Sequence, residues 1–138
     1  MSLDEVLKGI INVNWPEKGG IYKVVQFMID ETPYIRFWHE IERGNHASIV
    51  KKFIDEKELG HREDVSGPSK RYYFTDEERH QIIGAGWCDL KGKKAEFFGA
   101  STDYEIIVDE GHLLNSISHI YPNREITYNS RRLYKRSM

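Results

Sequence analysis

The stretch IYKVVQFMI, residues 21 to 29, is a run of β-branched and aromatic residues, the composition that β-strands favour. The run is apolar on both faces, so we expect a strand in the interior of a sheet, with the rest of the domain built around it. Lys23 departs from this pattern because it places a cation inside the run. Its head group must reach solvent, pair with an acid or face an anionic ligand.

The segments on either side extend this arrangement. After the turn DETP, residues 34 to 42 alternate roughly between apolar and polar, and they predict a second strand joined to the first by a hairpin. Gly44 and Asn45 end that strand and cap a helix over about residues 46 to 58. Near the N-terminus, a capping-box spacing and an apolar stripe predict a short helix over residues 3 to 12.

Residues 59 to 80 are polar and irregular, apart from the stretch RYYF, which suits an edge strand. We therefore expect an insertion or a mobile loop, since long loops inside a domain are often functional or mobile. The stretch TDEERHQI at its end fits either one or two helical turns or the start of the next strand.

The second half of the chain predicts a hairpin, a helix and a last strand. The hairpin joins strands near residues 82 to 90 and 94 to 100, and the helix carries leucine and isoleucine at helical spacing until Pro122. Residues 124 to 129 form the last strand. The order β, β, α, β, β, α, β indicates an α+β fold: a mixed sheet of about five to six strands, two main helices and the short N-terminal helix.

Length and composition narrow the class of protein. A chain of 138 residues suits one domain over residues 1 to 138, and a net charge of −2 gives no general attraction to nucleic acid or anionic lipid. The basic tail, residues 131 to 138, is more often a solvated end than a nucleic-acid arm. One cysteine, Cys88, allows no internal disulfide, and no run is long enough to span a membrane. We therefore expect a soluble, cytoplasmic protein.

His46 stands at the first position of the predicted helix. A helix N-terminus disfavours a positive charge, so the imidazole should be biased toward its neutral, nucleophilic form. His46 is therefore either a catalytic imidazole or a surface residue without a role.

Several short stretches, in this order along the chain, resemble the phosphohistidine phosphatase family, also called the Janus/Ocnus family. GGIYKVVQFMI at residues 19 to 29 is similar to the opening strand of the family, and HASI, starting at His46, to the beginning of its helix. GAG at 84 to 86 and FFGAS at 97 to 101 resemble its glycine-rich turn and its phosphate-cradling loop. GHLLNSISHIYPNREITYN, residues 111 to 129, resembles its second helix and last strand.

The resemblance implies a metal-independent hydrolase without a cofactor. His46 would be the nucleophile or the general acid/base, and Lys23 would hold the phosphoryl group. Gly99, Ala100 and Ser101 would cradle the anion with backbone N–H groups and a hydroxyl. From the residues alone, Lys23 also suits an edge strand that resists aggregation, and the three small residues suit a plain exit from a strand.

Three departures from the family pattern affect the site. A second alignment shifts the register and places Lys51 where the family has its histidine. Trp87 stands where the family has a basic residue, and Asp103 adds a carboxylate that would repel a phosphate unless it points away.

The sequence thus favours a phosphatase-like hydrolase acting on phosphohistidine or a related phosphoramidate, with a phosphorylated protein or small molecule as partner. Two alternatives remain open. The same scaffold could bind a phosphorylated or anionic partner without turnover, or the basic tail could serve an RNA-binding or interaction protein.

Overall fold

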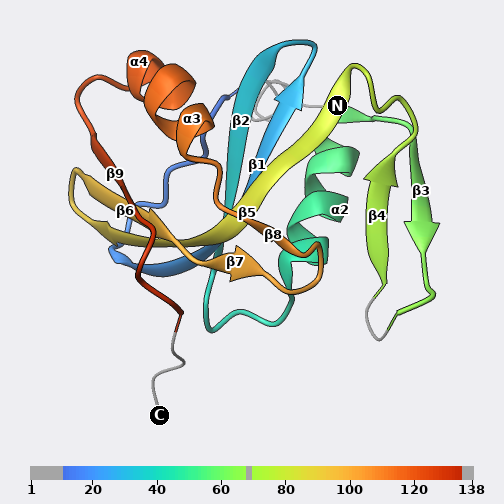
Figure 1. Cartoon of the computed structure of the whole chain (residues 1–138), viewed down its shortest axis with the longest axis horizontal. Coiled ribbons are helices and arrows are strands. Elements are labelled where there is room, and N and C mark those ends of the chain that lie inside the picture. The colour runs from blue at the N-terminus through green and yellow to red at the C-terminus, as the bar shows by residue number, and fades with distance from the viewer. Residues whose placement is uncertain (1–10, 68–69, 135–138) are drawn as a thin grey trace.

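A five-stranded mixed sheet forms the centre of the computed structural model, which describes residues 11–67 and 70–134 (Figure 1). Its strand order is β2-β1-β5-β6-β9, and all neighbouring pairs are antiparallel except β6 and β9. The strands are β1 (Gly20–Ile29), β2 (Thr32–His39), β5 (His80–Lys91), β6 (Lys94–Phe98) and β9 (Glu125–Asn129). The predicted α+β fold is confirmed, and so is the interior position of the first strand.

Helices cover both faces of this sheet. Helix α2 (His46–Lys57) lies on one side, and a second helical segment lies on the other (Figure 1). That segment runs without a break through α3 (Glu110–His112), the π-helical turn η1 (Leu113–Ile117) and α4 (Ser118–Ile120). Alternate residues of each strand therefore enter separate cores, one beneath each helical layer.

Helix α2 begins where its sequence signal places it. The Asn45 side chain accepts a hydrogen bond from Ser48 N at 3.1 Å, and the Ser48 hydroxyl accepts one from Asn45 N at 3.2 Å. This reciprocal cap satisfies two backbone donors that the first helical turn leaves unpaired. The buried face of the helix packs on β1, β2 and β4 and consists of His46, Ala47, Ile49, Val50, Phe53 and Ile54.

On the other face, a buried polar cluster ties β1 to α3. Gln26, fully buried, donates from Nε2 to His112 Nδ1 and to the Asp109 carbonyl, both at 3.0 Å. Because that bond makes His112 Nδ1 an acceptor, Nε2 carries the ring proton, and it donates to the Phe27 carbonyl at 3.2 Å. Burial lowers the pKa of His112 to about 4, so the ring is neutral near pH 7.

Residues 59 to 80 differ from the predicted irregular loop. Strands β3 (His61–Asp64) and β4 (Arg71–Phe74) pair as a separate two-stranded sheet beside α2. RYYF is thus a strand, as predicted. Its partner was missed because HRED has no apolar alternation, and pairing is instead supported by an ion pair of 3.1 Å between Arg71 and Asp64. A second short pair, β7 (Ala100–Ser101) and β8 (Ile106–Ile107), was also not predicted.

Smaller differences concern the ends of elements. The second strand stops at His39 instead of residue 42. Of the two alternatives for TDEERHQI, the structure has the start of a strand, since β5 begins at His80 after a turn over residues 77–79. Most of the helix predicted over residues 3 to 12 lies outside the described residues, and Ile11 and Asn12 are not helical. None of the helices that the structure describes is long and apolar enough to cross a membrane.

Candidate active site

A row of side chains crosses the α2 face of the sheet just beyond the N-terminus of the helix. Trp38, Lys23, Trp87 and Phe98 are direct partners on the neighbouring strands β2, β1, β5 and β6. Opposite residues on paired strands point to the same face, so the four side chains lie next to one another. Trp38 packs against the core beneath α2, so the four side chains lie on the α2 face of the sheet.

His46 faces this row from the first turn of α2. The imidazole is 6% exposed, and its ring centroid lies 5.6 Å from that of Trp87 in an edge-to-face arrangement. Its Nε2 is 2.8 Å from the carbonyl oxygen of Gly86. A carbonyl only accepts, so Nε2 is the protonated nitrogen and Nδ1 keeps the lone pair of the neutral ring.

The surroundings of His46 favour this neutral form. Burial is the largest effect and lowers the pKa of the imidazole below its ordinary value. The hydrogen bond to Gly86 and the charge of Asp103 raise the pKa, and the charge of Lys23 lowers it. The bias toward a neutral ring, expected from the helix N-terminus, thus comes first from burial.

Lys23 lies beside Trp87 at the edge of a groove of about 340 Å³. Its Nζ donates to the Glu40 carbonyl at 3.2 Å and lies 5.4 Å from the centroid of the Trp87 ring. Since β1 is an interior strand, a role for Lys23 in protecting an edge is ruled out. The described residues that line the groove are Lys23, Glu40, Ile41, Glu42, Arg43, Gly44, Trp87 and Tyr134. His46 is not among them, because the Trp87 ring lies beside it.

The three residues expected to cradle an anion occupy different environments. Gly99 has a φ of +77°, and an ideal Cβ there would lie 3.0 Å from Trp87 Cδ1, so Gly99 packs against the row. Ala100 is exposed and pairs with Ile107 in the short sheet. Ser101 is buried, and its hydroxyl accepts from Tyr104 N at 3.3 Å. The structure therefore places Gly99 against Trp87, whereas the Ser101 hydroxyl holds its own turn.

Lys51, the alternative to His46 in the second alignment, lies one turn further along α2. Its ammonium is 2.6 Å from the Asp55 carboxylate in an i,i+4 ion pair near the surface. Lys51 therefore lines an outer surface of the helix, where it shares a pocket with Trp38, whereas His46 packs against Trp87.

No pattern in the sequence places the C-terminal segment across the site. Arg132 places its guanidinium carbon 4.2 Å from the centroid of the Phe98 ring and pairs with Asp89 and Glu96 at 2.9 and 2.7 Å. Tyr134 stacks on Trp87 with ring centroids 3.5 Å apart and planes 3° from parallel. A tyrosine between basic residues was the available signal. That signal also fits a solvated tail, because no local periodicity links it to β5.

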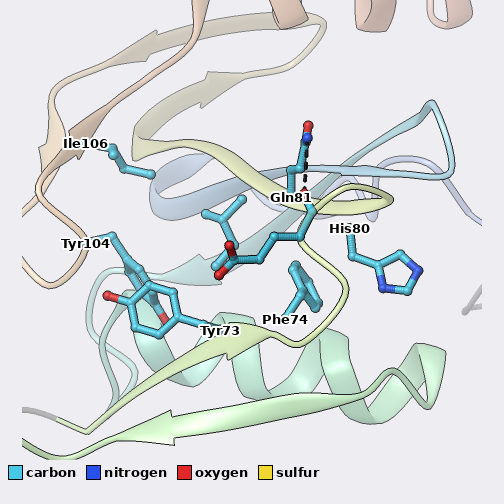
Figure 2. Close-up of a pocket in the computed structure, with 8 residues that line it drawn as sticks. Tyr73, Phe74, His80, Gln81, Tyr104 and Ile106 are labelled. Atoms are coloured by element: carbon cyan, nitrogen blue, oxygen red, sulfur yellow. Dashed lines mark hydrogen bonds between the residues drawn. The ribbon is translucent and has the colours of Figure 1, made fainter.

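A second cavity of about 240 Å³ lies between the β3–β4 hairpin, β5 and the β7–β8 pair. Tyr73 and Tyr104 meet edge to face, with centroids 5.6 Å apart, and Figure 2 shows them side by side, with Phe74 nearby. The described lining residues are mostly aromatic or aliphatic and include no lysine or arginine. This cavity therefore lacks the positive charge that a phosphoryl group requires.

Comparison with known proteins adds no family. No protein-family model matches the chain, and no curated protein matches it.

Within residues 11–67 and 70–134, no cluster of three or more histidine, cysteine, aspartate or glutamate residues could hold a metal ion. The Cys88 thiol is buried, and burial raises its pKa, so it is not a ready nucleophile. The residues that can carry a function in this site are therefore His46, Lys23 and Trp87.

Proposed function

We propose that this protein hydrolyses a phosphorus–nitrogen bond, as in phosphohistidine or another phosphoramidate, with His46 as the catalytic residue. The observation that carries the proposal is the fixed tautomer of His46. Its Nε2 proton is held by Gly86 O, which leaves the Nδ1 lone pair of a buried, neutral imidazole for chemistry. Groups with a pKa shifted by burial and a charged neighbour cluster at functional sites, and His46 has both.

Two balanced routes use this imidazole. As a general base, Nδ1 takes a proton from water while the water oxygen bonds to phosphorus and the phosphorus–nitrogen bond breaks. The proton on Nδ1 then passes to the departing nitrogen, giving phosphate and an amine. As a nucleophile, Nδ1 bonds to phosphorus while the phosphorus–nitrogen bond breaks and the departing nitrogen takes a proton from solvent; water then attacks the phosphorus, which breaks the bond to Nδ1 and gives phosphate. Both routes need the neutral ring.

Lys23 supplies positive charge for the phosphoryl oxygens. Its charge lowers the pKa of His46, as the smallest of four effects, and both residues lie beside the Trp87 ring. An ammonium with three donors can follow the phosphoryl oxygens as charge develops during transfer. Trp87 lines the groove and also meets the His46 ring edge to face, so it connects the groove to the imidazole.

A second candidate function is recognition of a phosphorylated or anionic partner without turnover. The observation in its favour is that Lys23, Arg43 and Trp87 line the groove while His46 does not. In that case the groove binds phosphate, and His46 contributes only to the packing of α2.

The test is release of phosphate from phosphoramidate and from phosphohistidine by the purified chain, measured against buffer alone. We expect turnover by the unmodified protein and loss of at least about 100-fold in rate for His46→Ala, the usual size of a lost acid–base group. His119→Ala is the matched control, since His119 is exposed at the end of α4 and should leave the rate unchanged.

Each outcome has a distinct meaning. No turnover above buffer, or full activity of His46→Ala, refutes the hydrolase. Binding of inorganic phosphate without turnover, lost in Lys23→Met but kept in the exposed Lys91→Met, establishes the binding module instead. An acid-labile phosphoprotein that is absent in His46→Ala distinguishes the nucleophile from the general base.

A further inference from the structure

Tyr134 makes two contacts that together resemble those of a bound ligand. Its ring lies face to face on Trp87, with centroids 3.5 Å apart, and its hydroxyl donates to the Glu40 carboxylate at 2.9 Å. Trp87 and Glu40 both line the groove beside Lys23. The groove thus offers a flat aromatic surface and, at its far side, a charged hydrogen-bond acceptor.

The segment that carries Tyr134 is anchored before this residue. Asn129 Oδ1 accepts from the backbone N–H groups of Arg131 and Arg132, which turns the chain back over the sheet, and Arg132 pairs with carboxylates of β5 and β6. Leu133, between the Arg132 anchor and Tyr134, is 71% exposed. The anchoring contacts do not involve Tyr134, and the contacts of Tyr134 with Trp87 and Glu40 are noncovalent ones that another ring can make.

We propose that Trp87 and Glu40 form a binding site for a planar ring with an O–H or N–H donor, and that Tyr134 fills this site in the absence of ligand. A phenol or an imidazole has this chemistry. The ring stacks on the indole, and its donor reaches the Glu40 carboxylate, a charge-assisted hydrogen bond. Lys23 Nζ, 5.4 Å from the indole centroid, favours an electron-rich ring or an anionic substituent.

This site goes beyond the proposed hydrolysis, because it requires no phosphoryl group on the ligand. For a phosphorylated ligand, this site favours a planar leaving group over an aliphatic amine, because only the planar group can stack on the Trp87 indole. Tyr134 then acts as a tethered competitor. A short tether gives an effective concentration in the millimolar range, which free ligands must overcome.

The experiment follows the indole N–H signals of ¹⁵N-labelled protein by NMR during titration with 4-methylphenol, the side chain of tyrosine. The chain has three tryptophans, so Trp87→Phe assigns the Trp87 signal, and Trp15 and Trp38 serve as internal controls. In Tyr134→Ala we expect a saturable shift of the Trp87 signal at about one tenth of the concentration needed in the unmodified protein. Leu133→Ala, the exposed neighbour, should behave like the unmodified protein.

Two further titrations test the chemistry of the site. Against Tyr134→Ala, the non-planar 4-methylcyclohexanol should bind about five-fold more weakly than the phenol, because it cannot stack. Adding Glu40→Gln should weaken phenol binding by about ten-fold, since the acceptor loses its charge.

The proposal is overturned if the phenol leaves the Trp87 signal of Tyr134→Ala unchanged, or if the two probes bind equally. The spectrum of each variant also shows whether it is folded, so a misfolded variant is not counted. The hydrolase is judged separately. A phenol-dependent shift without any turnover refutes the hydrolase alone, and turnover without ring binding refutes the ring site alone.

Discussion

The imidazole of His46 donates from Nε2 to the carbonyl of Gly86 at 2.8 Å, joining residues 40 positions apart in the chain. Gly86 directly precedes Trp87, and Trp87 pairs with Phe98 at the end of the β5–β6 ladder. The bond therefore links the first turn of α2 to the point where β6 leaves its partner strand. This link sets both the tautomer of the ring and its distance from Lys23 and Trp87.

We predict that nearby charges move the pKa of His46 in opposite directions. Lys23→Met removes a positive charge that lowers the pKa, so the pKa should rise. Asp103→Asn removes a negative charge that raises it, so the pKa should fall. The measurement is the titration of the His46 ring signals by NMR, which needs no enzymatic activity. Shifts of the same sign in both variants would place one of these charges away from the site.

The pH profile of hydrolysis should follow the same ionisation. The reactive form is neutral, so the rate should fall with decreasing pH as His46 is protonated. Burial lowers its pKa, which puts the midpoint below the ordinary histidine value of about 6.5. The profile of kcat/KM reports this group in the free enzyme. A midpoint above the ordinary value would show that the imidazolium is stabilised, contrary to the structure.

Gly86→Ala should destabilise the domain. An ideal Cβ would lie 2.6 Å from the carbonyl oxygen of Phe98 and 2.6 Å from Val108 Cγ2, and the backbone contact cannot be relieved by a rotamer change. We expect a loss of about 2 kcal/mol in the free energy of unfolding, measured with urea. The control is Gly111→Ala, exposed and helical, which should be neutral or stabilise by about 0.5 kcal/mol. Equal free energies of unfolding for Gly86→Ala and Gly111→Ala would mean that Gly86 is not this close to the Phe98 carbonyl.

The sequence predicted those elements whose signal is local. The apolar run of β1, the Asn45 cap and the Pro122 stop each act over a few residues, and all three mark real boundaries. The β3 strand was missed because its own residues show no strand pattern, and only its pairing with β4 makes this segment a strand. Short-range patterns cannot report pairing that depends on ion pairs across a hairpin.

The candidate site was predicted residue by residue, but its arrangement was not. His46 and Lys23 could be named because each is unusual in its own segment. That Trp87 lies beside both follows from strand register, and the stack with Tyr134 follows from the path of the chain after β9. Both depend on tertiary structure, which a single sequence does not display.

The buried ion pair of Arg36 and Glu56 should contribute more than a surface pair on the same helix. Arg36 Nε lies 3.1 Å from the Glu56 carboxylate, and the Arg36 side chain is 4% exposed. Removing the carboxylate leaves a buried charge less well compensated, so Glu56→Ala should cost about 2 kcal/mol of unfolding free energy. Asp55→Ala, which breaks the exposed pair with Lys51, should cost little. Similar losses in both variants would show that the core does not depend on this pair.

Protonation of His112 should make the domain sensitive to acid. The pKa of this ring is about 4 in the folded state and about 6.5 when unfolded, so below pH 6.5 the unfolded chain binds the proton first. Stability present above pH 6.5 is therefore lost as pH falls toward 4, at up to about 1.4 kcal/mol per pH unit. His112→Gln should flatten the dependence of urea stability on pH between 6.5 and 4, and the exposed His119→Gln should not. An unchanged slope in His112→Gln would assign the acid sensitivity to other groups. His46, buried and with its pKa lowered, contributes in the same direction, so part of the slope should remain in His112→Gln.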